Sequence, residues 1–132
     1  MIRYLATVPV FVSDQDTALQ FYEDKLGFEV VMDMPYGGGA RWLTVKPKHG
    51  ETELLLFAAN SPNAPEDAGR RVGGWTGMVF RTDDIRKTYD ELRGRGVEFE
   101  AEPSQQPWGG METWFSDPDG NRFHLAQRPD RP

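Results

Sequence analysis

The sequence VPVFVSDQDTALQFYEDKLGFEV, residues 8–30, contains the pattern that decides the fold. Its first five residues alternate, with valine on one face, as in a half-buried strand. The segment 13–16 then supplies a helix N-cap and negative charge for the first turn. Four apolar residues follow at helical spacing: Ala18, Leu19, Tyr22 and Leu26. Gly27 can end this helix as a left-handed C-cap, and a second strand is predicted to begin at Phe28.

The same order of signals returns in the second half of the chain. Residues 76–81 are strand-like, the acidic segment 82–84 can cap a helix, and Gly96 can end that helix. Three apolar residues form its buried stripe: Ile85, Tyr89 and Leu92. Three further strands are predicted in each half, at 28–32, 41–45 and 52–57 and at 97–100, 111–116 and 122–127. We infer an internal duplication.

Glycine and proline mark the connections between these elements. Residues 35–39, 47–50 and 117–121 have the composition of turns, and residues 103–110 are predicted to be a loop. Residues from about 59 to 74 are rich in alanine, proline, asparagine and glycine and show no period, so they are predicted to be a linker.

Composition excludes several classes of function. The 132 residues carry a net charge of −6, which disfavours nucleic acid as a partner because phosphate binding needs a basic face. No apolar run approaches the roughly 20 residues of a membrane helix, and the first residues lack the apolar stretch of a signal peptide. The chain has no cysteine, which removes thiolate chemistry. We expect a cytoplasmic protein without a membrane partner.

Several motifs, in order along the chain, resemble those of one family. They are Val10-x-Val12-Ser13-Asp14, Ala18-Leu19-x-Phe21-Tyr22, Leu26-Gly27-Phe28-Glu29-Val30, Gly96-Val97, Gln106-Pro107-Trp108-Gly109 and Asp117-Pro118-Asp119-Gly120-Asn121. Over residues 4–128 the chain is similar to the vicinal oxygen chelate superfamily, which includes glyoxalase I, the bleomycin-resistance proteins and the extradiol dioxygenases.

The resemblance implies an α+β fold in which two tandem βαβββ modules form mixed, curved sheets that enclose a cavity. The modules would cover residues 1–58 and 75–128 of a single glyoxalase-like domain, 1–132, joined by the linker at 59–74. It also implies a homodimer.

Strand parity then predicts which side chains line the cavity, because the face that does not pack on a helix is free to meet a ligand. The candidate ligand-binding residues are Thr7, Phe11, Trp42, Phe57, Gly77, Trp114 and His124 on strands, with Trp108 on a loop that could cross the cavity mouth. Each tryptophan could instead be core filler, and Trp108 could equally be part of a structural turn.

A metal site is not expected. The resemblance places metal ligands at four positions, which correspond here to Thr7, Gly77, a position near Glu53, and His124. Glycine has no side chain to coordinate an ion, and threonine is a poor ligand beside imidazole and carboxylate. Only Glu53 and His124 remain, so we expect no metal and no other cofactor.

The function predicted from these residues is metal-independent binding of a small planar or aromatic metabolite or drug, with sequestration as the role. The alternative is an enzyme of the same superfamily, either a metal-dependent lyase or dioxygenase or a metal-free isomerase that uses His124 and Glu53 as catalytic residues. His124 could instead be a half-buried histidine that is hydrogen-bonded to a neighbour, and Glu53 and Glu112 are its possible partners. A third possibility is an interaction module.

Overall fold

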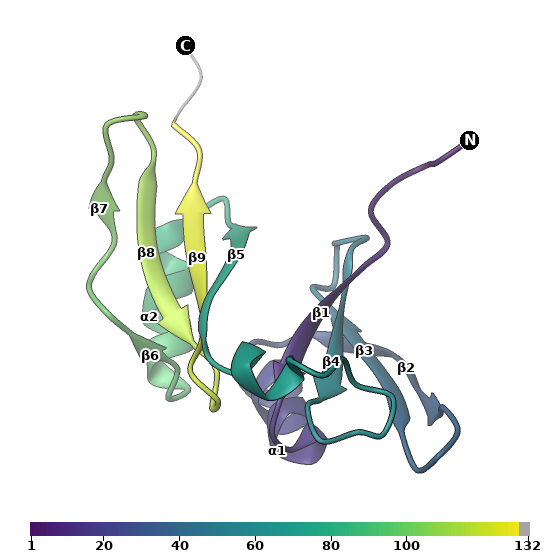
Figure 1. Cartoon of the computed structure of the whole chain (residues 1–132). Coiled ribbons are helices and arrows are strands. Elements are labelled where there is room, and N and C mark those ends of the chain that lie inside the picture. Colours follow the sequence, from purple (N-terminus) through teal and green to yellow (C-terminus); the bar gives the residue numbers. More distant parts are fainter. Residues whose placement is uncertain (130–132) are drawn as a thin grey trace. The chain divides into compact units, whose positions relative to one another are not determined.

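The computed structural model describes residues 1–129, and the chain divides into two compact units, residues 1–73 (unit 1) and the remainder from Gly74 (unit 2) (Figure 1). Each unit has one sheet with both parallel and antiparallel pairs. Within residues 1–129, no helix combines the length and the apolar character that a membrane crossing requires.

Unit 1 has a four-stranded sheet in the order β1-β4-β3-β2. Its elements are β1 (Thr7–Val12), α1 (Gln15–Leu19), η1 (Gln20–Lys25), β2 (Glu29–Pro35), β3 (Arg41–Lys46), β4 (Glu53–Ala58) and the short 3-10 helix η2 (Ala68–Arg71). Strands β1 and β4 are parallel, and the other neighbouring pairs are antiparallel.

Unit 2 repeats this arrangement, with the strand order β5-β9-β8-β6. Its elements are β5 (Gly74–Arg81), α2 (Ile85–Gly94), β6 (Glu98–Phe99), β7 (Ser104–Gln105), β8 (Met111–Ser116) and β9 (Asn121–Gln127). The outer strand β5 is again parallel to the last strand of its unit. The two equivalent sheets confirm the predicted α+β fold of tandem βαβββ modules.

Both helices begin at an aspartate and are followed by a glycine, as the sequence predicts. The Asp14 carboxylate accepts a hydrogen bond from the Thr17 backbone N–H at 2.8 Å, and the Asp84 carboxylate accepts one from the Lys87 N–H at 3.1 Å. Gly27, with a φ of 75°, takes the left-handed conformation that ends the first helical segment.

The first helical segment departs from the predicted pattern. After α1 the helix widens into the π-helix η1, in which Leu26 donates its backbone N–H to the carbonyl of Phe21, five residues earlier. Of the four residues predicted from the helical spacing, Ala18 and Tyr22 are buried and Leu19 and Leu26 are half-buried, and Phe21 is buried as well.

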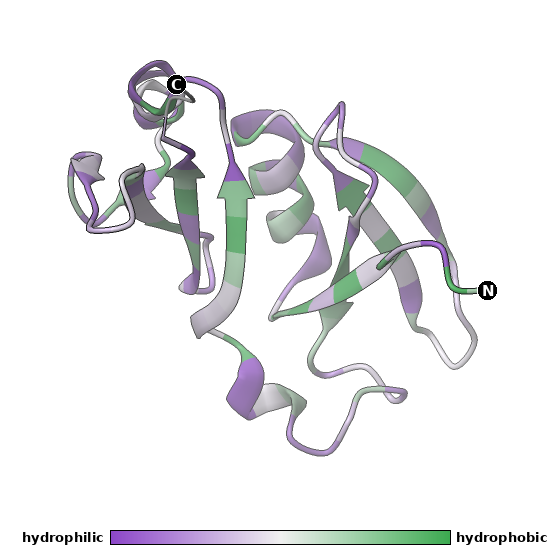
Figure 2. Cartoon of the chain, turned by 90° about the horizontal axis from the view of Figure 1, so that it is seen from above, coloured by the Kyte–Doolittle hydropathy of each residue, from purple (hydrophilic) through white to green (hydrophobic). Residues whose placement is uncertain are grey.

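The core of each unit lies where the strand alternation predicts it. In unit 1, six aliphatic residues at alternate strand positions are at most 4% exposed: Val10, Val12, Leu43, Val45, Leu54 and Leu56. In unit 2, aromatic rings fill the corresponding layer, and Tyr89 of α2 meets Phe99 edge-on at 4.8 Å between ring centroids. The coloured bands along the strands in Figure 2 follow this alternation of apolar and polar residues.

Two connections in unit 2 have a defined structure. Residues 103–110, predicted as loop, include β7, which pairs with β8 because the chain turns back along that strand. The segment 117–121 is a hairpin turn, as predicted, and it is closed by the Asp117 carboxylate. This group accepts hydrogen bonds from the backbone N–H and the side-chain amide of Asn121, at 2.9 and 2.8 Å.

Candidate functional site

Three of the unit 1 strand positions that alternate with the aliphatic core carry aromatic side chains, Phe11, Trp42 and Phe57. Phe11 of β1 and Phe57 of β4 are register partners with ring centroids 5.7 Å apart. The Arg71 guanidinium, from η2, lies 4.3 Å above the Phe11 ring. On β3, the Trp42 ring lies 5.1 Å from that of Tyr36. Phe11 is buried, whereas Phe57 and Trp42 are half-buried.

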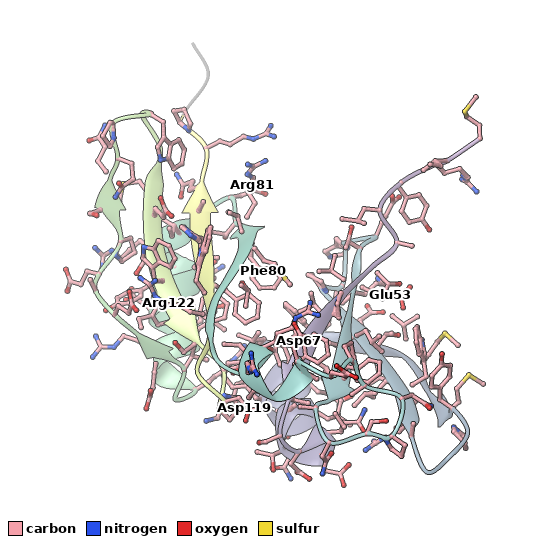
Figure 3. All side chains as sticks on the ribbon, in the orientation of Figure 1. Glu53, Asp67, Phe80, Arg81, Asp119 and Arg122 are labelled. Atoms are coloured by element: carbon pink, nitrogen blue, oxygen red, sulfur yellow. The ribbon has the colours of Figure 1, made fainter. Side chains whose placement is uncertain are left out.

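Two other predicted site residues lie at the opposite end of the β1–β4 pair. Thr7 and Glu53 are partners in the parallel register, and both are half-buried. Figure 3 labels Glu53 on its strand. No hydrogen bond joins the two side chains within the described part of the chain, and the Glu53 backbone N–H bonds instead to the Ala6 carbonyl.

Unit 1 also has a polar pocket of about 360 Å³ beside the start of α1, and none of the predicted site residues lines it. Arg41 lies in its wall and pairs with Asp33 at 2.7 Å and with Asp16 at 2.6 Å. The hydrogen bond from Arg41 lowers the pKa of the Asp33 carboxyl. Because Arg41 already binds two carboxylates, it is poorly placed to hold an anionic ligand.

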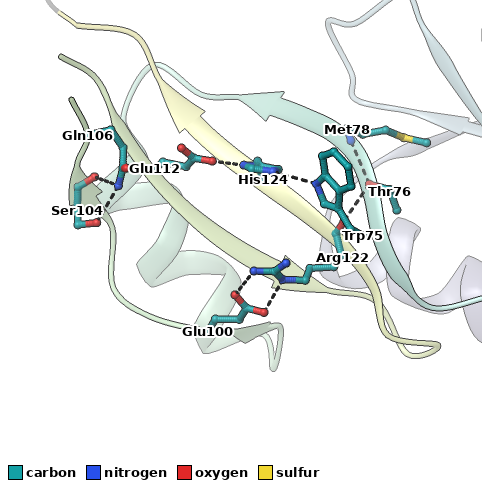
Figure 4. A network of polar contacts seen from close by, with 9 residues as sticks. All are labelled: Trp75, Thr76, Met78, Glu100, Ser104, Gln106, Glu112, Arg122 and His124. Atoms are coloured by element: carbon teal, nitrogen blue, oxygen red, sulfur yellow. Dashed lines mark hydrogen bonds and ion pairs between the residues drawn. The ribbon is translucent and has the colours of Figure 1, made fainter. Parts of the chain in front are cut away.

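In unit 2, one face of the sheet carries a connected network of polar and aromatic side chains (Figure 4). The Trp75 indole N–H donates to His124 Nε2 at 3.2 Å. The other imidazole nitrogen, Nδ1, is hydrogen-bonded to Glu112 Oε1. Trp75 comes from β5, His124 from β9 and Glu112 from β8, so the network crosses three neighbouring strands.

Trp75 is held by a bulge in β5. Between Trp75 and Val79 the strand advances four residues while its partner β9 advances two, from Arg122 to His124. The Thr76 hydroxyl donates to the Arg122 carbonyl at 2.8 Å and accepts from the Met78 N–H at 3.1 Å, so it replaces the lost ladder bonds.

Gly77 completes the bulge with a φ of 76°, a conformation that favours glycine. A Cβ atom at this position would lie 3.8 Å from the Trp75 ring, so the indole packs over the Gly77 backbone.

Trp114 differs from Trp75 because one of its ring faces is covered. The Arg122 guanidinium lies 3.8 Å above the Trp114 ring, and the His124 ring contacts it as well. Arg122 is held by Glu100 through two hydrogen bonds of 2.5 and 2.7 Å, which lower the pKa of the Glu100 carboxyl. Trp114 is half-buried as a result, whereas Trp75 is 68% exposed.

The residues at the metal-ligand positions do not fit a metal ion. In unit 2, Gly77 offers no donor atom, and the lone pair of His124 Nε2 accepts the Trp75 N–H. In unit 1, Thr7 and Glu53 provide one hydroxyl and one carboxylate. Among residues 1–129, no three histidine, aspartate or glutamate side chains gather as a metal site would require.

The structure brings some predicted residues together and leaves others apart. His124 and Trp114 are adjacent, and Gly77 supports the tryptophan that contacts His124. Trp108 stands on the turn before β8 and is 49% exposed. The carboxylate that contacts His124 is Glu112, from the same unit, whereas Glu53 belongs to unit 1.

Sequence reasoning missed Trp75. The predicted strand began at Thr76, so this tryptophan, the first residue of the second module, was assigned to no strand and to no site. The signal that could have placed it is parity, because Trp75 precedes Gly77 by two residues and so belongs to the same strand face.

Comparisons with known proteins place this geometry in context. Residues 3–125 match the model of the Glyoxalase/Bleomycin resistance protein/Dioxygenase superfamily. A solved member of that superfamily from Sphaerobacter thermophilus is 42% identical, with a TM-score of 0.89 over 96% of this chain and 98% of that one. YetH, an uncharacterised protein of Bacillus subtilis, is 39% identical over 96% of this chain and all of its own length. TnmS3, an antibiotic-binding protein from Streptomyces sp. CB03234, is 37% identical, with a TM-score of 0.78 over 96% of this chain and 97% of that one.

Proposed function

Because this chain belongs to the Glyoxalase/Bleomycin resistance protein/Dioxygenase superfamily, we propose that it binds a small planar or aromatic molecule, without a metal, and sequesters it. The observation that carries the proposal is the placement of aromatic side chains on the strand positions opposite the core in both units, among them Phe57, Trp42 and Trp75. Aromatic walls with few polar groups are typical of small-molecule sites. A relative at 37% identity is an antibiotic-binding protein, which supports binding of a small molecule.

The arrangement around His124 favours binding over catalysis. A general base needs a free lone pair within reach of the substrate proton. In His124 that lone pair, on Nε2, accepts the Trp75 N–H, and Nδ1 is committed to Glu112. The imidazole is therefore occupied at both nitrogens, which argues against the isomerase alternative.

The proposal is tested with two carboxylates of similar size and different shape. Anthracene-2-carboxylate is flat, and adamantane-1-carboxylate is globular with the same charge. We expect the flat acid to quench tryptophan fluorescence saturably and to show a heat of binding by calorimetry, while the globular acid shows neither.

A chelator added before the titration, and mass spectrometry after it, complete the experiment. We expect EDTA to leave the dissociation constant unchanged and the anthracene acid to be recovered unmodified. Equal binding of both acids, loss of binding with EDTA, or conversion of the probe would each contradict metal-independent sequestration.

A further inference from the structure

We propose that Trp75 is the principal stacking residue for the ligand and that His124 and Glu112 are positioning residues that fix its indole ring. The stacking role rests on the proposed function, because it names a contact residue for the ligand proposed there. The positioning role is a property of the protein without ligand and is testable separately.

The hydrogen-bond chain assigns the protonation of His124. An indole N–H can only donate, so His124 Nε2 must be the acceptor and carries no proton. The Glu112 carboxylate can only accept, so Nδ1 must carry the proton. His124 is therefore neutral, in the Nδ1–H tautomer. The Glu112 carboxylate stabilises this tautomer by accepting from Nδ1–H, and the Trp75 N–H binds the unprotonated Nε2 that it leaves. The second partner of an imidazole commonly sets the tautomer in this way.

The bulge in β5 fixes Trp75 from the backbone side. Thr76 bonds the bulge to β9, and Gly77 lets the backbone turn without a side chain beneath the indole. The ring is thus anchored at its polar edge by His124 and supported over Gly77, although it is 68% exposed. An exposed tryptophan without such anchoring would sample several rotamers, and a ligand would have to restrict them.

This arrangement specifies how the ligand is recognised. The indole N–H is already used, so Trp75 offers a ligand its aromatic face rather than a hydrogen bond. Trp114 is a poorer stacking residue because Arg122 already covers one of its faces. The ligand is therefore a flat aromatic system that stacks on Trp75 and gains affinity because the ring is already fixed.

Nuclear magnetic resonance of the free protein tests the positioning role. We expect the ¹⁵N spectrum of His124 to show a protonated Nδ1 and a bare Nε2, and the Trp75 indole N–H to exchange slowly despite the exposure of its ring. The signal is assigned with Trp75→Phe. His124→Phe removes the acceptor and should make the indole N–H exchange fast, whereas His124→Gln, which can accept at the same position, should restore protection.

His49→Phe, in a turn of unit 1, is the matched control and should leave the Trp75 signal unchanged. An Nε2–H tautomer in the wild type, or an indole N–H that exchanges as fast as in a free peptide, overturns the positioning role even if the His124 variants fail to fold.

Binding of anthracene-2-carboxylate tests the stacking role. We expect Trp75→Ala to weaken binding about tenfold, within the range typical of aromatic stacking, and Tyr4→Ala, which removes another exposed aromatic ring, to leave it unchanged. Retained affinity in Trp75→Ala, with the wild type binding, overturns the stacking role alone. If the wild type binds no flat probe, the proposed function and the stacking role fail together, and the resonance data still decide the positioning role.

Discussion

Replacing Gly77 with alanine tests the bulge that presents Trp75. The substitution adds one methyl group at a backbone position with a φ of 76°. The added Cβ would meet the Trp75 ring at 3.8 and 4.0 Å, which is ordinary van der Waals contact. Any loss of stability therefore comes from the backbone conformation and not from a steric clash.

The magnitude follows from that conformation. An L-residue in the left-handed region costs about 1–2 kcal/mol relative to glycine. Alanine also restricts the unfolded chain, but where φ is positive the strain exceeds this gain. We expect the free energy of unfolding to fall by about 1 kcal/mol, which lowers the urea midpoint by about 0.5 M for a typical urea dependence of about 2 kcal/mol per M.

Gly94→Ala provides a matched control in the same unit. Gly94 ends α2 with a φ that is not positive, and a Cβ there would meet nothing within 4 Å. Alanine favours the helix, so this variant should be more stable than the wild type by up to about 1 kcal/mol. Urea unfolding followed by circular dichroism measures both variants.

Gly77→Ala is therefore expected to lower the free energy of unfolding, and Gly94→Ala to raise it. A neutral or stabilising Gly77→Ala, beside a stabilising Gly94→Ala, would refute the left-handed bulge and remove the backbone support inferred for Trp75. A loss well above about 3 kcal/mol would point to a clash that the distances exclude.

Two further predictions concern the stability of each unit. Asp117→Ala should lower the free energy of unfolding by about 2–4 kcal/mol, because the buried backbone N–H and side-chain amide of Asn121 lose the Asp117 carboxylate as acceptor. A urea midpoint close to that of the wild type would contradict this prediction. The Thr17 hydroxyl and backbone N–H hold the pKa of Asp14 below its ordinary 3.8. The folded state therefore binds a proton at Asp14 less readily than the unfolded state does. The contribution of ionised Asp14 to stability is lost as the pH falls below about 4. Asp14→Asn keeps the cap without the titration and should lose less stability between pH 4 and 2 in acid unfolding; equal losses would disprove this role.

Much of the fold follows from short-range rules that the sequence displays. Alternating valines and leucines set which strand faces pack, and the cap residues Asp14 and Asp84 set where the helices begin. The widening of the first helix after Leu19 could not be predicted in this way. Helical spacing assumes 3.6 residues per turn, whereas the π-helix has a wider turn, and Phe21, which that spacing did not select, is buried beside Tyr22.

The candidate site was predictable in its aromatic character but not in its connections. Parity placed His124 and Trp114 on one face of unit 2. The sequence left Glu53 and Glu112 as possible partners of His124, and within unit 2 its carboxylate contact is Glu112, two strand positions away across the β8–β9 pair. A cross-strand contact of this kind depends on the register between strands, which neither strand's own sequence reveals.

By itself, the sequence determined a duplicated module, its two sheet faces and the absence of good metal ligands at Thr7 and Gly77, because periodicity, capping and side-chain chemistry are properties of neighbouring residues. Only the tertiary structure decided that the Trp75 indole N–H would donate to Nε2 of His124, 49 residues later, while the indole ring faces outward. The physical reason is the bulge in β5, since two extra residues opposite β9 carry the indole over a glycine and bring its N–H to the lone pair of His124.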